Sequence, residues 1–533
     1  MKAGKLVLCV GLMVLLGASA VRAQTGSGER IGTVVFPISC GAAAQQEFGR
    51  ALAMLHSFWF DAAGKAFAAV TQAEPGCAMG HWGEAMTHLF SPNPFVGVPT
   101  PKGLQEGCPA VERARAAGAK TPREGDYIGA VESLCKDRDK ADQRARVVAY
   151  EQAMGRLSAR YPEDREAAIF YALALNITAT PSDKTYAQQL KAAGILEKVF
   201  AEQPNHPGVA HYLIHSYDYP PIAGRGLPAA RRYAGIAPSA PHALHMPSHI
   251  FTREGFWQES IDSNLASATA AKNHFDKLHA MDYLAYANLQ MARDVAARRV
   301  LDDLRELGKP NVEHFVTGYA LAAIPSRYAL ERGRWADAAS LALSPSDFPW
   351  SRYAQSEAVM VFARGLGAAR GGNAAVAHES IERLQALRDT LIAAKLGYWA
   401  DQADIQRRVV AAWTARAEGK TQEALQILRV AAEAEDATAK HPVTPGPLAP
   451  ARELLGEMLL ELNQPREALK EFEASMRVEP TRFRGLYGAA RAAELSGDRA
   501  KARKYFGDLA ALAATSDAER PEVAEAKAFL AKP

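Results

Sequence analysis

The motifs that identify most enzyme classes are missing from this sequence. It contains no HExxH zinc-protease motif, no GxSxG nucleophile elbow, no glycine loop for phosphate or dinucleotide binding, and no CxxCH haem attachment. These absences argue against the enzymes that carry such motifs. They leave open an enzyme in which a bound metal activates water, with Asp218 or Glu254 as the first acid–base candidates.

A strong charge of one sign is also missing. The formal net charge is +3, and it becomes zero without residues 1–23, which contain three basic and no acidic side chains. A balanced chain gives no electrostatic reason to expect nucleic acid or an anionic membrane as its partner. We therefore expect neither.

Long apolar runs are limited to one, from Leu6 to Ala18. Two lysines precede it and the small-x-small sequence Val-Arg-Ala at 21–23 follows it, which is typical of a cleavable signal peptide. No cysteine stands at the cleavage point to carry a lipid, and no later run is long enough to span a membrane. The sequence thus predicts a secreted or periplasmic protein.

Cysteine is rare and unevenly placed. Beyond the predicted signal peptide only Cys40, Cys77, Cys108 and Cys135 remain, all in the N-terminal quarter. In an oxidising compartment this even number predicts up to two disulfides, with three pairings open. A thiol metal site is less favoured, because no CxxC spacing occurs.

Alanine is abundant and alternating strand-like runs are scarce, which predicts an all-α protein. A small residue, a bulky residue and a proline recur at offsets 0, +4 and +12, as in Ala468, Phe472 and Pro480. Ala502 and Phe506 follow 34 residues later. The small residue lets two helices approach, the bulky one fills the next layer, and proline ends the helix. Such a period predicts stacked pairs of antiparallel helices.

These spacings, together with the phrases HYLIHSYD, HALHMPSHIF and PARELLGEMLL, resemble an uncharacterised branch of bacterial exported tetratricopeptide repeat (TPR) proteins. The resemblance implies an all-α, TPR-type α-solenoid over most of the mature chain. It implies no activity, because such scaffolds carry many functions.

The same pattern divides the chain into segments. We expect a signal peptide at 1–23, an N-terminal extension at 24–43, TPR-like hairpins at 44–180 with a loop-rich insertion at 91–109, central TPR hairpins at 181–330, degenerate hairpins at 331–440, and C-terminal TPR hairpins at 441–533 that begin with the proline-rich connector HPVTPGPLAP at 441–450.

Histidine is concentrated in one stretch, since seven of the 14 histidines lie between His211 and His279. His211 and His215 share one helix face, and adding the 34-residue period to each gives His245 and His249. A repeat frame set by the prolines places a larger group on positions that line the concave surface of the TPR proteins the chain resembles. The group is His211, His215, Asp218, His242, His245, His249, His279 and Tyr283.

Two interpretations of this group follow. In the first, an exported TPR scaffold binds a peptide, protein or small ligand in its concave groove, and the histidines are polar lining. In the second, His211, His215, His245 and His249 hold one transition-metal ion (Zn, Cu, Ni or Fe), with Asp218 completing or orienting the shell. A hydrolytic or oxidative metalloenzyme is then the alternative function. The scaffold is the favoured function, with the histidine group as its binding site.

Other candidates have weaker signals. We expect His56 to pack in the core and His206 and His274 to lie exposed between helices. Arg482, Arg484 and Arg491 are expected on a solvated helix face, with an anion-binding face as the alternative.

Overall fold

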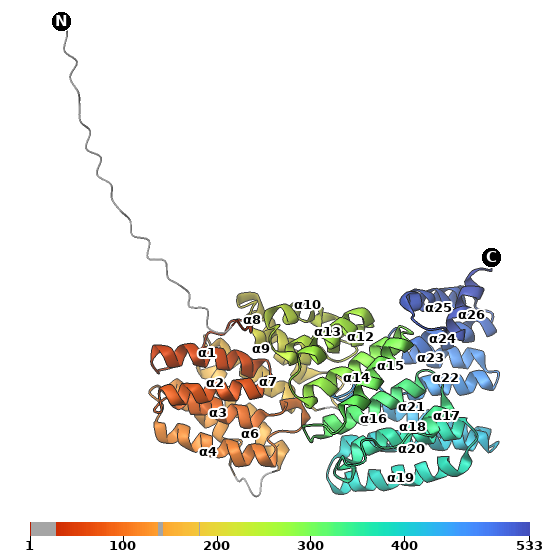
Figure 1. The fold of residues 1–533 in the computed structure, drawn as a ribbon, viewed down its shortest axis with the longest axis horizontal. Coiled ribbons are helices and arrows are strands. Elements are labelled where there is room, and N and C mark those ends of the chain that lie inside the picture. Colours follow the sequence, from red (N-terminus) through yellow and green to blue (C-terminus); the bar gives the residue numbers. More distant parts are fainter. Residues whose placement is uncertain (2–27, 137–141, 181, 533) are drawn as a thin grey trace.

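The computed structural model describes residues 1, 28–136, 142–180 and 182–532, and within them all regular structure is helical. The helices stack in pairs along the molecule from α1 to α26 (Figure 1). This confirms the predicted all-α, TPR-type solenoid. Apart from Met1, the predicted signal peptide lies outside the described residues.

In the N-terminal half, consecutive helices pack as antiparallel pairs. They are α1 (Ala42–His56) with α2 (Phe60–Ala73), α3 (Ala78–Phe90) with α4 (Pro101–Ala117), α5 (Pro122–Glu132) with α6 (Gln143–Arg160), α7 (Arg165–Thr178) with α8 (Ala187–Glu202), and α9 (Pro207–Tyr217) with α10 (Leu227–Ile236).

The C-terminal half continues the same arrangement. The first helix of the next pair is broken into α11 (Pro241–His245) and α12 (Pro247–Glu254), which pack on α13 (Trp257–Ala270). There follow α14 (His274–Gln290) with α15 (Asp294–Leu307), α16 (Phe315–Leu330) with α17 (Trp335–Ala339), α18 (Ala354–Arg370) with α19 (Ala374–Ala393), α20 (Gly397–Ala417) with α21 (Thr421–Ala437), α22 (Ala451–Glu461) with α23 (Pro465–Ser475), α24 (Phe483–Leu495) with α25 (Arg499–Leu512), and α26 (Pro521–Leu530).

Close packing between small and bulky residues holds the pairs together, as the repeat pattern predicts. Phe67 and Phe472 are completely buried. A Cβ atom added at Gly83 would lie 2.2 Å from the Phe67 ring, and one at Gly488 would lie 2.2 Å from the Phe472 ring. The bulky side chain of each pair therefore fills a space that only glycine leaves open in the following helix.

The C-terminal hairpins return to the middle of the array. The Asp517 carboxylate accepts hydrogen bonds from the backbone N–H groups of Val295 and Ala296, at 2.9 and 2.8 Å, in the first turn of α15. Arg482 is fully buried, and its guanidinium donates to Glu453 (2.7 Å) and to Glu331 (2.8 Å). The expectation of a solvated face at Arg482 is wrong, because this return covers it with α16 and α22.

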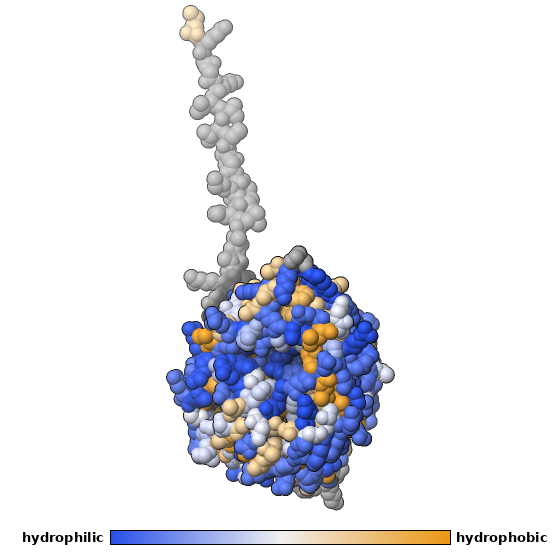
Figure 2. Space-filling model, turned by 90° about the vertical axis from the view of Figure 1, so that its right-hand side faces the viewer, coloured by the Kyte–Doolittle hydropathy of each residue, from blue (hydrophilic) through white to orange (hydrophobic). Residues whose placement is uncertain are grey.

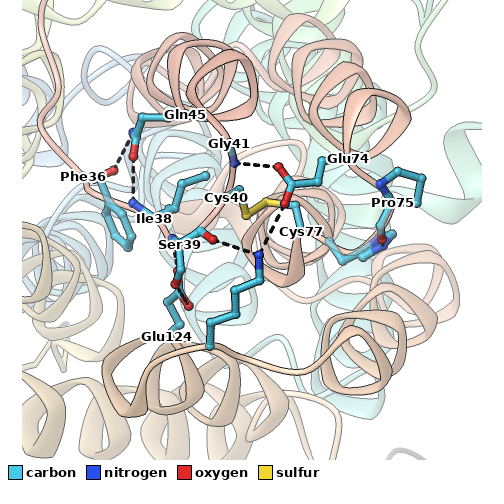
Figure 3. The surroundings of a disulfide bond; sticks show 12 residues. Phe36, Ile38, Ser39, Cys40, Gly41, Gln45, Glu74, Pro75, Cys77 and Glu124 are labelled. Carbon is cyan, nitrogen blue, oxygen red and sulfur yellow. Dashed lines mark hydrogen bonds and ion pairs between the residues drawn. A yellow bond between two sulfur atoms is a disulfide. The ribbon is translucent and has the colours of Figure 1, made fainter.

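Two disulfides fasten the N-terminal hairpins, and they join Cys40 to Cys77 and Cys108 to Cys135. The first ties the segment before α1 to the turn after α2, where Glu74 also accepts a hydrogen bond from the Gly41 N–H at 2.6 Å (Figure 3). One of the three pairings left open by the sequence is thus selected.

Two segments between helices enter the inner face of the solenoid. The insertion after α3 is shorter than expected, because α4 already begins at Pro101, with the Thr100 hydroxyl accepting from the Gly103 N–H. The proline-rich connector lies against α14, where the Tyr283 hydroxyl donates to the carbonyls of Pro442 and Thr444, each at 3.1 Å. Its inward course was not expected from its composition.

The face formed by the C-terminal half carries a hollow near its centre, with mostly hydrophilic residues around it (Figure 2). No helix in the described part of the chain has both the length and the apolar character that crossing a bilayer requires.

Candidate metal centre

Four consecutive inner helix segments bring six histidines together. His211 and His215 come from α9, His242 and His245 from α11, His249 from α12 and His279 from α14. Each is at most 9% exposed. The predicted groove residues therefore do converge, but they form a buried cluster and not the lining of an open groove.

The first triad consists of His211, His215 and His242. The Nε2 atom of His211 lies 3.2 Å from Nε2 of His215 and 3.2 Å from Nε2 of His242. The Nδ1–H of His211 donates to the His56 carbonyl at 2.7 Å, so its Nε2 offers one lone pair. One lone pair cannot accept a proton from two neighbours, so hydrogen bonding leaves the triad incompletely satisfied.

The spacing of these nitrogens suits a metal. Imidazole nitrogens lie about 2.0–2.1 Å from a tetrahedral zinc ion, which puts them about 3.3 Å from one another. The separations of 3.2 Å between the Nε2 atoms are close to this value. The triad thus has three nitrogen ligands in place.

The second triad consists of His245, His249 and His279. The Nδ1–H of His245 donates to Asn264 Oδ1 at 2.7 Å, and that of His249 donates to Asp218 Oδ2 at 2.8 Å. Their Nε2 atoms therefore both carry lone pairs, yet they face each other at 3.0 Å. Nδ1 of His279 is buried with no hydrogen-bond partner. A cation between these rings would relieve the repulsion.

Burial favours the neutral, metal-binding form of all six imidazoles. The pKa of each lies below its usual value, because burial penalises the charged ring. Neighbouring histidines add repulsion at all but His249, where burial outweighs the opposing charge of Asp218. Neutral imidazole is the form that ligates metals, so the site needs no proton release from its rings at neutral pH.

A third cluster shows what a satisfied arrangement looks like. Glu166 accepts N–H donors from His56 Nε2 (2.9 Å) and His206 Nε2 (2.8 Å), and Tyr212 bonds His56 Nδ1 at 3.0 Å. Although burial opposes it, the two imidazoles hold the pKa of Glu166 at about 2. His56 is buried as predicted, whereas the expected exposure of His206 is wrong, because its ring turns inward to Glu166. With His206 Nδ1 accepting from the Val209 N–H at 3.3 Å, both nitrogens of His56 and of His206 have hydrogen-bond partners.

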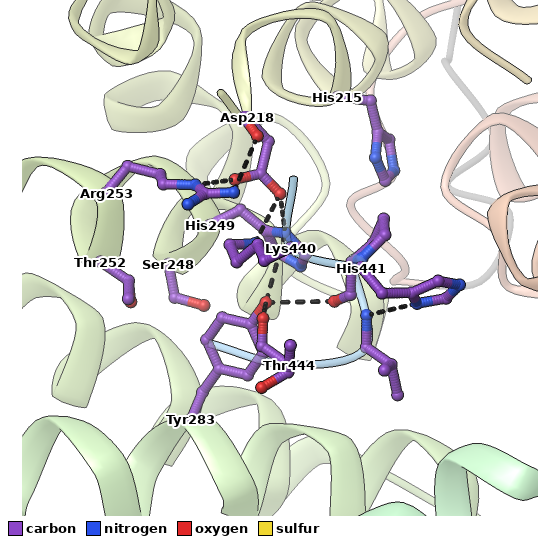
Figure 4. A network of polar contacts seen from close by, with 12 residues as sticks. His215, Asp218, Ser248, His249, Thr252, Arg253, Tyr283, Lys440, His441 and Thr444 are labelled. Atoms are coloured by element: carbon purple, nitrogen blue, oxygen red, sulfur yellow. Dashed lines mark hydrogen bonds and ion pairs between the residues drawn. The ribbon is translucent and has the colours of Figure 1, made fainter. Parts of the chain in front are cut away.

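Asp218 orients the second triad and ligates nothing itself. Its Oδ2 accepts from His249 and from Lys440 Nζ at 2.9 Å, and its Oδ1 accepts from Arg253 Nε at 2.9 Å (Figure 4). Despite burial, the charges of Lys440 and Arg253 hold the pKa of Asp218 well below its usual value. A carboxylate behind a ligating histidine fixes its ring and raises its basicity. Glu254, the other acid–base candidate, lies by Gly224.

Several residues of the site gave no signal in the sequence. Lys440 stands directly before the connector, 222 residues beyond Asp218, and Asn264 comes from α13, on the outer helix of its pair. Phe95, in the insertion after α3, stacks on His215 with ring centroids 3.8 Å apart. None of these positions belongs to the histidine period, so spacing could not reveal them.

The insertion and the connector close the cluster from the groove side. Phe95 covers His215, and Pro442 and Val443 line a remaining cavity of about 10 Å³ beside His249 and His279. This volume suffices for one water-sized molecule. A peptide has no room at the histidines in this conformation.

No protein-family model and no curated protein matches the chain. Among solved structures, the human IFIT1 dimer with m7Gppp-AAAA is 12% identical with a TM-score of 0.40, covering 82% of this chain and 90% of that chain. The APC/C hetero-tetramer Cut9–Hcn1 is 11% identical with a TM-score of 0.29, covering 92% and 95%. The P58(IPK) TPR domain is 10% identical with a TM-score of 0.20, covering 92% and 98%. Likeness at this level carries no argument about ligands.

Proposed function

We propose that this chain is a metal-binding helical-repeat protein that holds two transition-metal ions, one in each histidine triad. The observation that carries the proposal is the pair of Nε2 lone pairs on His245 and His249, which face each other at 3.0 Å with both Nδ1 protons committed elsewhere. The crowded Nε2 of His211 supports the same conclusion for the first triad.

The donor set narrows the choice of ion. Imidazole suits zinc, copper, nickel and iron, and for a given nitrogen site divalent copper binds most tightly. Three nitrogens leave at least one position per ion for water or a small ligand. The four-histidine, one-ion site expected from the sequence thus becomes two three-histidine sites, with His242 and His279 as the added ligands.

The protein's own residues prepare the site for such ions. The His56 carbonyl, Asn264 and Asp218 fix the proton on Nδ1 of His211, His245 and His249, respectively. Bound ions would supply Lewis acidity or redox chemistry, so a metalloenzyme is one use of the centre. A predicted signal peptide and the two disulfides support an exported location.

A scaffold for a peptide or protein partner is the second candidate. The repeat fold supports it, and open space exists along the inner face beyond the connector. Such a partner would contact α16, α18 and α20 and would leave the histidines covered.

Elemental analysis of the purified, dialysed protein tests the metal proposal. We expect two ions per chain. His211→Ala with His215→Ala should remove one ion, and His245→Ala with His249→Ala should remove the other. Changing His88 and His378, whose side chains are 41% and 57% exposed, to alanine is the matched control and should retain both ions. A folded wild-type protein that takes up no copper or zinc would refute the proposal.

A further inference from the structure

A cavity of about 1130 Å³ lies on the far side of the connector from the histidines. Its lining includes residues of α16, α18 and α20, the first helices of three successive hairpins, of the connector, and of the segments 182–186 and 475–479. We propose that this cavity binds a small organic anion with an aromatic body. The proposal concerns a site separate from the metal centre and does not depend on metal binding.

The apolar wall of the cavity is the reason to expect an aromatic body in the ligand. Tyr319, Phe362, Tyr398 and Trp399 line the cavity together with aliphatic side chains of α18 and α20 and with Pro447 and Leu448 of the connector. Ligand pockets usually measure about 300–1,000 Å³ and are mainly hydrophobic, with a few polar groups that set orientation. Aromatic rings in the wall favour a ring system in the ligand through stacked or edge-to-face contacts.

The charged side chains of the lining are the reason to expect an acidic group in the ligand. Five cationic side chains line the cavity against three carboxyl groups. Asp436 is paired with Arg452 at 2.6 Å and Glu479 with Arg253 at 3.7 Å. Burial raises the pKa of the third, Glu435, to about 8, so it is mostly uncharged at neutral pH. Asp218, which lies outside the lining, also accepts from Lys440 and Arg253 at 2.9 Å each, so among the five cations only Lys184 and Arg477 have no carboxylate partner in the described part of the chain.

Two of the cations are free to meet an anion. Lys184 and Arg477 are exposed, and neither has a carboxylate within ion-pair distance among the residues that the structure describes. Gln406 also lines the cavity, and its Oε1 is buried without a hydrogen-bond partner. A ligand with an acidic head at Lys184 and Arg477 and a ring with a donor group toward Gln406 would satisfy all three.

The connector gives the cavity a fixed wall. Tyr398 accepts a hydrogen bond from the His441 N–H at 2.9 Å, and Arg327 donates to the Gly446 carbonyl at 3.1 Å. The cavity is thus held open by contacts that a ligand need not make, which lowers the ordering cost of binding.

Two fluorescent probes of the same ring system test the proposal in the full folded chain. The anion 8-anilinonaphthalene-1-sulfonate should bind with a stoichiometry of one, measured by titration calorimetry and fluorescence. Lys184→Glu with Arg477→Glu should weaken it by about tenfold or more, since both favourable charges reverse. The uncharged N-phenyl-1-naphthylamine should bind this variant as it binds the wild type. Lys198→Glu with Arg466→Glu, two exposed positions outside the cavity, is the matched control and should change neither probe.

Filling the cavity separates specific binding from general adhesion. Gln402→Trp places a large side chain at a half-buried lining position, and it should weaken binding of both probes while the circular dichroism and melting temperature stay unchanged. Unchanged affinity of both probes for Gln402→Trp would overturn the proposed site. Equal affinity of the sulfonate for the wild type and the charge-reversed variant would overturn the anion. Metal content is measured on the same samples, so a metal-free protein that binds the sulfonate would refute the metal proposal alone.

Discussion

Asp218→Asn removes the negative charge that three buried donors share. It therefore tests most directly the hydrogen bonds that hold the second triad in place. The side chains of Lys440 and Arg253 are 4% and 2% exposed. With Asp218 neutral, both cations stay buried and only Glu479, 3.7 Å from Arg253, remains as a counter-charge. Breaking a buried ion pair from one side costs about 3–5 kcal/mol, and we expect the metal-free variant to lose that much unfolding free energy.

The pH dependence of this loss has a definite sign. Burial lowers the pKa of Lys440 to about 8 in the wild type. Without Asp218 the folded-state pKa falls further, so the variant can shed this proton near neutral pH. In the unfolded chain Lys440 stays protonated at both pH values, and the cost of giving up or burying that proton on folding grows as the pH falls. The loss of unfolding free energy caused by Asp218→Asn should therefore be smaller at pH 8 and larger at pH 6.

Urea denaturation of four proteins measures the coupling: wild type, Asp218→Asn, Lys440→Met and the double variant. The double variant should be more stable than Asp218→Asn alone, because it no longer buries an unpaired ammonium. Additive effects of the two changes, or a loss below about 1 kcal/mol for Asp218→Asn, would refute the reasoning.

Metal affinity of the same variant provides an internal control. Loss of a carboxylate behind a ligating histidine typically lowers affinity by about 10–100-fold. Competition with a chelator should show this loss for one ion only, since His249 belongs to the second triad and the first triad does not contact Asp218. Equal weakening of both ions would contradict the assignment of two separate sites.

Three further predictions concern stability. The six histidines have folded-state pKa values below the ordinary value of 6.5, so the folded state binds fewer protons than the unfolded chain. The metal-free protein should therefore keep full stability above pH 6.5 and lose stability as the pH falls. Melting temperatures at pH 7.5 and pH 5 measure this. Gly83→Ala should cost about 1–3 kcal/mol, because its Cβ would enter the Phe67 ring, whereas Gly129→Ala in α5, with nothing within 4 Å, should be neutral or stabilising in the same urea titration. Arg482→Met leaves the buried carboxylates of Glu331 and Glu453 without their cationic partner, and calorimetry should show a loss of about 3–5 kcal/mol in unfolding free energy. An unchanged melting temperature would contradict that pairing.

Much of the fold was accessible from the sequence because repeat packing is local. A small residue opposite a bulky one, with proline at the end, reports contacts between neighbouring helices, and Phe67 and Phe472 occupy the predicted places. Contacts between distant repeats leave no such periodic signal. Arg482 therefore looked like a surface residue, although its partners Glu331 and Tyr286 lie 151 and 196 residues away in sequence.

The candidate site was accessible in part for the same reason. The 34-residue period identified His211, His215, His245, His249 and His279, and the inner helices of successive repeats do bring them together. The grouping differs, since His242 joins the α9 pair and His279 joins His245 and His249. The helix is also broken between His245 and His249, where α12 begins at Pro247. Neither the break nor the inward course of the connector follows from residue spacing.

The contact between the start of α15 and the segment 515–520, which joins α25 to α26, changes what kind of solenoid this is. An open array behaves like a string of units, in which each repeat is stabilised by its immediate neighbours and can fray from the ends. Here the Asp517 carboxylate caps a helix that begins 223 residues earlier, so the last repeat is fastened to the middle of the chain. The C-terminal end of the array is thus fixed to its interior. Disrupting this contact would destabilise the central repeats together with the last one.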